Sequence, residues 1–377
     1  MTIFLAGGGS GGPTTPLLAV ATELKKQKKD VEIFFIGNNR RLDQPFLQDF
    51  GSPVKYLSLP AGKWRRYFSL LNLTDLLRTF FGFWKALYLL KRYQPDIVIG
   101  AGSFVQVPLA WAAFFRKIPV LVHQPDLPIL LSTRLVVPVA KVITVSFNLS
   151  GKELPASSGL FKRGGKDRVI WTGNPVRREI LHGSREQARQ IFGLAGGRPV
   201  LLVMGGARGA RRINETVAAA LPELLRYVEV IHATGGKSSA RLAREQLPST
   251  LAGRYHDFQF LGEKLPHAYA AADLVLGRGG MATIAELSTL GKPAILVPLA
   301  GPQEENVRLL AFLKAAVGVR EEYLEPKFLV RLVRKILWSR EIQETLRENI
   351  SRLMPHDADR KIAKLIVKIC EEHQPTN

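Results

Sequence analysis

The chain opens with an apolar run, Thr2–Leu5, that leads into a glycine cluster at 6–12 and then into a helical pattern. A strand, a glycine turn and a helix bring the backbone close to a phosphate or a sugar, because the turn lacks side chains and the helix N–H groups point outward. The same unit returns at Val200–Gly209. The repeat predicts two α/β domains, each with a ligand site at the carboxyl ends of its strands.

The first glycine turn also fits the dinucleotide fingerprint G-x-G-x-x-G, at Gly7, Gly9 and Gly12. That fingerprint needs an acidic residue about 20 positions further on, at the end of the second strand, to hold the ribose hydroxyls. The second predicted strand, 31–36, is followed by Gly37-Asn38-Asn39 and has no acid at its tip. The sequence therefore argues against a nicotinamide dinucleotide.

Apolar runs without polar alternation predict strands of parallel sheets that are covered on both faces. The predicted strands are 2–6, 31–36, 54–59, 96–101, 118–123, 141–146 and 167–171, then 199–204, 228–233, 256–261, 273–277, 293–298 and a short one near 318. Helical patterns end the chain at about 325–338, 340–353 and 358–372. The fold class predicted is α/β, with two doubly wound, Rossmann-like domains that face each other across a cleft.

We place the first domain at residues 1–172 and the second at 173–356, with Gly173-Asn174-Pro175 in the link. The last helix, at about 357–377, has no βαβ partner and is expected to pack back on the first domain. Two such domains form the GT-B arrangement of glycosyltransferases, which a few epimerases and phosphorylases share. The fold alone therefore does not settle the function.

The net charge of +21 over 377 residues favours polyanionic partners, which are phosphorylated substrates, anionic lipid or nucleic acid. A general basic bias that serves only solubility is the alternative. The single cysteine, Cys370, excludes a disulfide framework and a cysteine-based metal site, as suits a reducing cytosol. We expect neither a secretion signal nor a membrane-spanning helix, because no run of roughly 18 apolar residues occurs.

The most specific segment is Asp273–Leu287, in which a predicted strand runs into a glycine turn and a helix. Thr283 and Glu286 have the spacing of a capping box, so a helix cap is the structural interpretation. The functional interpretation is that the free amides of residues 281–283 hold a diphosphate while Glu286 accepts hydrogen bonds from ribose hydroxyls. A further helix opens at Gln303–Asn306, at the same edge of the predicted sheet.

Taken together, these motifs resemble the MurG family of UDP-N-acetylglucosamine transferases, in glycosyltransferase family 28. The matching motifs, in chain order, are Gly8–Gly12, Gly100–Val105, His123–Asp126, Thr172–Arg177, Gly205–Arg211, Arg278–Glu286 and Gln303–Asn306. The resemblance implies inverting, metal-independent transfer of N-acetylglucosamine (GlcNAc) from UDP-GlcNAc to a polyprenyl-diphosphate-linked muramoyl-peptide. This is the step from lipid I to lipid II in peptidoglycan synthesis, and it implies no cofactor.

The resemblance also implies roles for particular residues. The first-domain loop near the diphosphate and the transferred sugar consists of Ser10, Gly11 and Gly12, and Arg177 follows the link between the domains. Leu261 offers its backbone to uracil, Gln303 reads sugar hydroxyls, and ribose and phosphates are held by Met281, Ala282, Thr283, Ile284, Ala285 and Glu286. Each role has a structural alternative, with Arg177 a surface charge, Leu261 a core residue and Gln303 a helix cap.

The chain departs from the family pattern at three positions of this site. Pro13 stands where the family has a histidine that is a proposed general base. Asp126 stands where the family has a donor-binding asparagine, which makes it a candidate both for the base and for a substrate contact. The alternative for Asp126 is that it caps a helix predicted at 128–139. Ala207 replaces a serine expected beside the α-phosphate, and the guanidinium of Arg208 could substitute for it.

Residues 63–93 carry seven basic side chains against one acid, Asp75, and are rich in aromatic residues. Such a segment is typical of helices that lie in a membrane interface and bind anionic head groups. A core helix with a basic outer face is the alternative, and we expect both uses. The better candidates for lipid contact, at the cytoplasmic face of the cell membrane, are Trp64, Phe68, Phe80 and Phe81. No RNA- or DNA-binding module accompanies the segment, so no nucleic-acid partner is expected.

Three other functions stay open at this point. A sister enzyme of the same fold could glycosylate another lipid, and a UDP-sugar epimerase could use acids and bases on either side of C2 of the sugar. The third is a UDP-sugar-binding homologue that lost catalysis together with the histidine at position 13.

Overall fold

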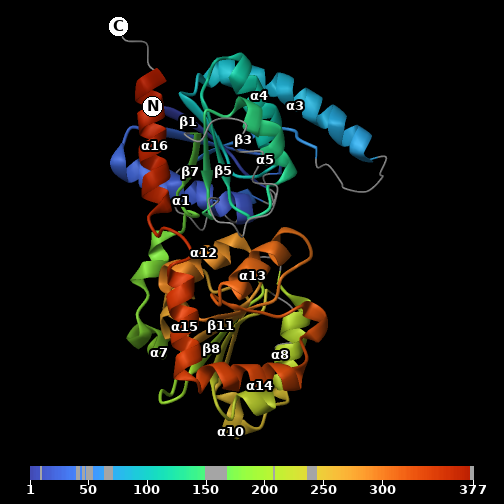
Figure 1. Ribbon diagram of the computed structural model, residues 1–377, viewed down its shortest axis with the longest axis vertical. Coiled ribbons are helices and arrows are strands. Elements are labelled where there is room, and N and C mark those ends of the chain that lie inside the picture. Colours follow the sequence, from blue (N-terminus) through green and yellow to red (C-terminus); the bar gives the residue numbers. More distant parts are fainter. Residues whose placement is uncertain are drawn as a thin grey trace. The chain divides into compact units, whose positions relative to one another are not determined.

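The computed structural model describes residues 1–8, 11–39, 43–44, 47, 54–62, 71–148, 168–206, 209–235 and 244–373, with the backbone alone for 71–72. The chain divides into two compact units. Unit 1 consists of Met1–Val176 and Met354–Asn377, and unit 2 is Arg177–Leu353. Figure 1 colours both units along the sequence.

A seven-stranded parallel sheet forms the centre of unit 1, in the order β3-β2-β1-β4-β5-β6-β7. Its strands are β1 (Thr2–Ala6), β2 (Glu32–Gly37), β3 (Lys55–Ser58), β4 (Ile97–Gly100), β5 (Val120–Gln124), β6 (Val142–Val145) and β7 (Val169–Trp171). Every residue of β1 after Thr2 is buried, as a strand with helices on both faces requires.

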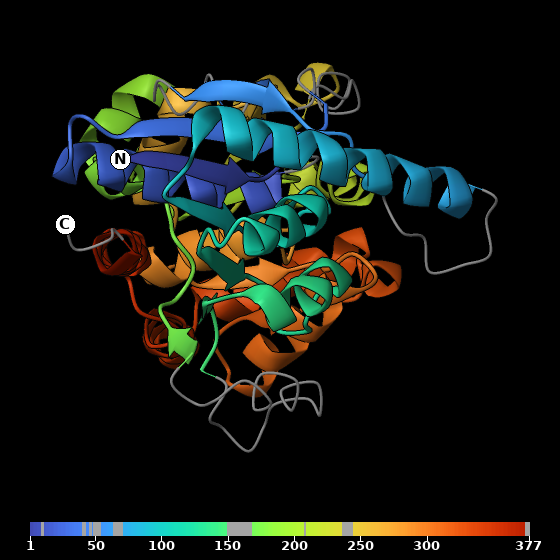
Figure 2. The same cartoon turned by 90° about the horizontal axis from the view of Figure 1, so that it is seen from above.

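Helices cover both faces of this sheet. In the described ranges they include α1 (Gly11–Gln27), α3 (Leu71–Tyr93), α4 (Gln106–Phe115), α5 (Leu131–Val136), the 3-10 turn η1 (Val137–Val139) and α16 (Ala358–His373). Alternate residues of β1 serve the two faces, because Phe4 packs in the core with α3 and α4 while Ile3 packs in the core with α1 and α16. The last helix of the chain thus completes the core of unit 1. The N-terminal part of α3 extends beyond the sheet (Figures 1 and 2).

Unit 2 has a six-stranded parallel sheet in the order β10-β9-β8-β11-β12-β13. Its strands are β8 (Val200–Met204), β9 (Glu229–Ala233), β10 (Tyr255–Phe258), β11 (Leu274–Gly277), β12 (Ala294–Leu296) and β13 (Val317–Gly318). Within its described residues, the α-helices with assigned bounds are α7 (Arg185–Phe192), α8 (Arg211–Leu224), α10 (Ser249–Ala252), α11 (Leu265–Ala271), α12 (Met281–Leu290), α13 (Pro302–Phe312), α14 (Pro326–Leu337) and α15 (Arg340–Ser351). The 3-10 turns are η4 (Arg178–His182), η5 (Gly262–Lys264) and η6 (Glu321–Tyr323).

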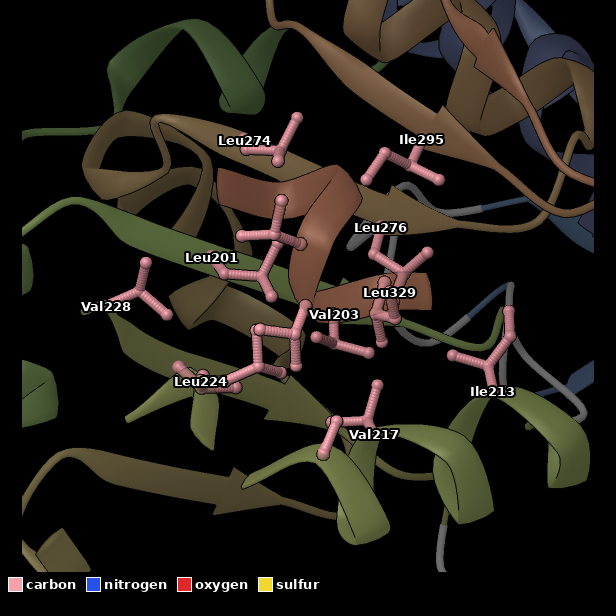
Figure 3. Packing of buried hydrophobic residues seen from close by; sticks show 14 of the residues in the cluster. Leu201, Val203, Ile213, Val217, Leu224, Val228, Leu274, Leu276, Ile295 and Leu329 are labelled. Atoms are coloured by element: carbon pink, nitrogen blue, oxygen red, sulfur yellow. The ribbon is translucent and has the colours of Figure 1, made fainter. Parts of the chain in front are cut away.

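Aliphatic side chains fill the core of unit 2. Leu201 and Val203 of β8 meet Val217 of α8 and Leu329 of α14, as Figure 3 shows. The strand residues are β-branched or leucine and are fully buried, so each one contributes roughly 1.5–3 kcal/mol of transfer free energy to folding.

In both sheets the strand order reverses at the first strand along the chain. The first strand, β1, lies between β2 and β4, and β8 likewise lies between β9 and β11. Ligands of doubly wound sheets bind outside the carboxyl ends of the strands at such a switch point. The glycine turns that follow β1 and β8 lie at these two points.

The predicted fold of two doubly wound α/β domains is confirmed, and each predicted strand is present with its ends shifted by at most a few residues. The helix predicted at 128–139 is wrong in extent, because α5 covers only Leu131–Val136 and gives way to η1. Pro138 lies in η1, and a proline has no N–H with which to continue an α-helix. None of the helices in the described ranges is both long enough and apolar enough to cross a membrane.

Candidate active site

The N-terminus of α12 is a candidate anion site of unit 2. Gly280 is the N-cap, in an extended conformation, and no side chain caps the helix. The capping-box interpretation of the sequence is therefore wrong, because Thr283 lies inside the first turn and Glu286 one turn further on. The first-turn amides of Met281, Ala282 and Thr283 have no intrahelical acceptor, and with the helix dipole they favour a negative group at this point.

Gln303 lies beside this helix start. Its amide Nε2 is 3.7 Å from the position that a Cβ on Gly280 would take, and its Oε1 accepts a hydrogen bond of 3.1 Å from the amide of Leu299. The N-cap of α13 is Gly301, so the alternative that Gln303 caps its helix is wrong. A side chain at Gly279 would strike Val307 of α13, so the missing Cβ lets the two helix starts approach closely.

Glu286 lies one turn further along α12 and is buried, with 6% of its surface exposed. The hydroxyl of Tyr269 donates a 2.8 Å hydrogen bond to Oε2, and Nη2 of Arg177 forms an ion pair with Oε1 at 3.6 Å. Burial raises the pKa of the Glu286 carboxyl, while the charge of Arg177 and the hydrogen bond from Tyr269 act in the opposite direction. The structure thus brings together two predicted site residues, Arg177 and Glu286, and rules out Arg177 as a mere surface charge.

Tyr269 was missed by sequence reasoning. It lies in the run Leu265–Ala271, where a tyrosine among alanines predicts only a packed helix. The one available signal was its polar hydroxyl, because a fully buried tyrosine needs a hydrogen-bond partner.

Leu261 lies beyond the end of the edge strand β10 and is 7% exposed. It is the N-cap of η5, and its carbonyl accepts a 2.8 Å hydrogen bond from the amide of Lys264. Its burial agrees with the core alternative for the side chain, and the predicted backbone contact with uracil stays a prediction. Ala207, with its neighbour Arg208, lies outside the described residues.

In unit 1 the described part of the glycine turn after β1 is held by hydrogen bonds of Gly7 and Gly8. Gly8 has a φ of +103°, and its amide donates to the hydroxyl of Thr14 at 3.2 Å. Gly11 and Gly12 begin α1, and Pro13 fits the first turn of the helix, where its missing N–H breaks no hydrogen bond. Ser10 lies outside the described residues.

Asp126 follows β5 and is partly exposed. Its backbone carbonyl accepts a 2.8 Å hydrogen bond from the side-chain amide of Gln124. The N-cap of α5 is Leu130, and no side chain caps that helix, so the capping alternative for Asp126 is wrong. Its role as base stays a prediction.

His123, in the same motif, is a structural residue. Its Nδ1 lies 3.0 Å from the hydroxyl of Thr144, and its Nε2 lies 3.0 Å from Oδ1 of Asn174. Burial lowers the pKa of His123 to about 4, so the ring is neutral at pH 7. Both ring nitrogens are occupied, and His123 therefore does not take over the function of the histidine that Pro13 replaces.

An exposed aromatic face covers parts of α3 and α4. We define it by Leu73, Leu76, Leu77, Phe80, Phe81, Trp84, Tyr88, Phe114 and Phe115, each of which exposes more than half of its surface. Its rings touch edge to face, as Phe80 does with Trp84 at a centroid distance of 6.2 Å. Arg78, Lys85, Lys91 and Arg92 lie on the same helix. Of the predicted lipid contacts, Phe80 and Phe81 belong to this face, whereas Trp64 and Phe68 lie outside the described residues.

Two family models match the chain. The glycosyltransferase family 28 N-terminal domain matches residues 3–145, and the C-terminal domain of that family matches residues 200–365. Among the curated proteins, a UDP-N-acetylglucosamine–N-acetylmuramyl-(pentapeptide) pyrophosphoryl-undecaprenol N-acetylglucosamine transferase of Clostridium kluyveri is 33% identical over 97% of this chain and 99% of its own. A transferase of the same name, numbered 2, from Bacillus cereus is 33% identical over 91% of this chain and 93% of its own.

The fold has close counterparts among solved structures. The crystal structure of Acinetobacter baumannii MurG is similar with a TM-score of 0.72 at 23% identity, over 97% of this chain and 99% of that one. A UDP-GlcNAc 2-epimerase from Neisseria meningitidis, bound to UDP-GlcNAc, gives a TM-score of 0.67 at 18% identity, over 98% of this chain and 100% of that one. At these identities the likeness shows the fold, and it confirms the predicted GT-B class.

Proposed function

The chain belongs to glycosyltransferase family 28, and we propose that it transfers GlcNAc from UDP-GlcNAc to a polyprenyl-diphosphate-linked N-acetylmuramyl-pentapeptide. The relatives named for this reaction align with nearly the whole length of the chain, so both units take part in the likeness. In the proposed division of labour, unit 2 binds the UDP-sugar and unit 1 binds the acceptor and the membrane. The product is the lipid II precursor of peptidoglycan.

The observation that carries the proposal is the start of α12, where the uncapped first-turn amides lie beside Gln303 of α13 and one turn before the buried Glu286. The amides of Met281–Thr283 bind the diphosphate, with Ile284 and Ala285 in the same turns of the helix. Glu286 accepts hydrogen bonds from the ribose, Gln303 contacts the sugar, and the backbone at Leu261 contacts uracil. Each contact uses chemistry that these groups possess.

Transfer with inversion is a single displacement at the anomeric carbon. The acceptor hydroxyl attacks, the bond to the UDP oxygen breaks, and negative charge develops on the departing diphosphate. The N-terminus of α12 stabilises that charge, since its dipole and N–H groups are already oriented toward it. The proton of the acceptor hydroxyl passes to a base, for which Asp126 is our candidate. No described group of three or more His, Cys, Asp or Glu side chains has the arrangement of a metal site.

The aromatic face with its neighbouring cations binds an anionic membrane surface, so the enzyme is a peripheral protein of the cytoplasmic face. Large exposed aromatic side chains beside Arg and Lys combine apolar insertion with attraction to anionic head groups. That position gives unit 1 access to a lipid-linked acceptor, whose diphosphate and sugar project from the membrane.

The test is incubation in deuterated water with UDP-GlcNAc and a lipid-linked N-acetylmuramyl-pentapeptide. We expect release of UDP, addition of GlcNAc to the acceptor, and no deuterium at C2 of the sugar. An epimerase would exchange the C2 proton for deuterium without needing the acceptor. That outcome would replace the transferase proposal with the second function that this fold supports.

A further inference from the structure

The side chain of Glu286 is both ionisable and buried, and these two properties oppose each other. It is a carboxylate with 6% of its surface exposed, and burial of an ionised carboxylate costs free energy unless other groups compensate its charge. In the described part of the chain, the charged or titratable groups that act on it are Arg177 and Tyr269. Arg177 carries a full positive charge, and its Nη2 lies 3.6 Å from Oε1 of Glu286. Tyr269 is a neutral donor, and its hydroxyl lies 2.8 Å from Oε2.

This pairing leaves acceptor capacity on the carboxylate. Each oxygen of an ionised carboxyl group has two lone pairs, and Tyr269 uses one on Oε2 while Arg177 faces Oε1. A buried carboxylate that is held but not saturated is suited to accept further hydrogen bonds from a ligand. A pair of neighbouring hydroxyls, such as the diol of a ribose, would complete its coordination.

The elements that carry these three side chains are tied to one another. The start of α11 lies against the segment that follows Arg177, because a Cβ on Gly183 would strike the carbonyl of Pro266 and the amide of Ser184 donates to Nδ1 of His267 at 3.2 Å. Beyond the end of α12, Nζ of Lys292 donates to the carbonyl of Ala272, just past the end of α11, at 2.8 Å. The position of the Tyr269 hydroxyl relative to Glu286 is therefore fixed before any ligand binds.

We propose that Tyr269 and Arg177 are positioning residues for the nucleotide, which keep the Glu286 carboxylate ionised and oriented so that it accepts hydrogen bonds from the ribose hydroxyls of UDP-GlcNAc. The inference rests on the proposed function, and it adds a residue that no motif of the sequence contains. Tyr269 is fully buried, so it acts on the ligand only through Glu286.

Calorimetry with UDP and with its 2′-deoxy and 3′-deoxy analogues tests the inference. Tyr269→Phe removes one hydroxyl, and we expect about 3- to 10-fold weaker binding of UDP at pH 7, with a smaller loss for an analogue that lacks the hydroxyl that Glu286 contacts. Tyr255→Phe is the matched control, because Tyr255 is equally buried in unit 2 but its hydroxyl bonds to His232. The control binds UDP as the wild type does. The second variant is Arg177→Gln, which changes a partly exposed side chain. We expect it to weaken the binding of UDP in the same way.

Two further readouts separate positioning from a general structural effect. In a Glu286→Ala background, Tyr269→Phe no longer weakens UDP binding, since the group it acts through is gone. The hydrogen bond from Tyr269 also lowers the pKa of Glu286, so its loss raises that pKa further. The variant therefore loses affinity for UDP at a higher pH than the wild type when the pH is lowered.

The outcomes are distinguishable. If the wild type binds neither UDP nor UDP-GlcNAc, the proposed function itself fails. If the wild type binds UDP and Tyr269→Phe binds it equally well with the same pH profile, the function stands and the positioning role is overturned. The positioning role is also overturned if Tyr269→Phe lowers the affinity for UDP and for both deoxy analogues equally, and if this loss persists in the Glu286→Ala background.

Discussion

Buried polar side chains determine the chemistry at the scale of single residues. Glu286 keeps two neighbours that favour its ionised form, whereas His123 and His232 are surrounded by neutral hydrogen-bonding groups and stay neutral. Sequence motifs located Glu286 and Arg177 but not Tyr269, because their contact joins three separate segments of unit 2. A role that depends on such a contact cannot be derived from spacing along the chain.

The base is the residue whose prediction is easiest to refute. Asp126→Asn keeps the size of the side chain but removes its basicity, so we expect kcat to fall by roughly 10²–10⁴ while UDP-GlcNAc binding stays within a few-fold. Steady-state kinetics and calorimetry on the same sample measure both quantities. A variant with nearly full kcat would show that the proton leaves by another route.

Two buried histidines make the stability depend on pH. Burial lowers the pKa of His123 and of His232 to about 4, from 6.5. Between these values the unfolded chain binds more protons than the folded one, so the free energy of unfolding falls as the pH drops from 6.5 toward 4. Each histidine contributes about 1.4 kcal/mol per pH unit in that window. In urea unfolding, His232→Gln should lose less stability than the wild type between pH 7 and pH 5, and an identical loss would refute the assignment.

At the scale of elements, the candidate site of unit 2 lies at the neighbouring starts of α12 and α13. The strands were predictable because their Val-, Ile- and Leu-rich runs can be buried only in a sheet covered on both faces. The start of α12 was misjudged, since the spacing of Thr283 and Glu286 imitates a capping box while Gly280 forms the actual N-cap. The preceding residue, Gly279, packs against α13, where a Cβ would clash with Cγ2 of Val307.

The close packing of Gly279 against Val307 gives a prediction in which a second substitution compensates for the first. Gly279→Ala introduces a methyl group against Val307, and the shift of α13 relative to α12 should weaken UDP-GlcNAc binding by about 10-fold or more. The double variant with Val307→Ala restores space and should recover most of the affinity. Gly253→Ala, at a glycine with open surroundings, is the control and leaves binding unchanged. Failure of the double variant to recover would refute the steric explanation.

The aromatic face gives a second prediction for an element. Phe81→Glu with Trp84→Glu should reduce binding to vesicles that contain anionic phosphatidylglycerol by about 10-fold or more, because two apolar insertions are lost and two negative charges gained. Trp338→Glu, at an equally exposed aromatic residue of unit 2, should leave vesicle binding nearly unchanged. Co-sedimentation measures the bound fraction. Equal effects of both changes would mean that net charge, and not this face, controls the binding.

At the scale of the whole molecule, one doubly wound architecture occurs twice, and we propose a different task for each copy. The glycine turns at β1 and β8 predicted the repeat, and the C-terminal helix was expected to return to the first domain because it had no strand to follow. Its apolar residues do pack with α1 in unit 1. What the sequence could not supply is the division of roles among buried polar groups, which depends on contacts between distant segments.

We propose that this chain transfers GlcNAc and that the α12 site of unit 2 supports the transfer. Both parts of this proposal are tested by a single-turnover reaction of labelled UDP-GlcNAc with a lipid I analogue in vesicles, with enzyme in excess. We predict conversion to the disaccharide-linked lipid by the wild type, and transfer slowed by at least about 10-fold in Glu286→Gln at the same thermal stability. No product from the wild type, or equal rates for both proteins, would contradict the account.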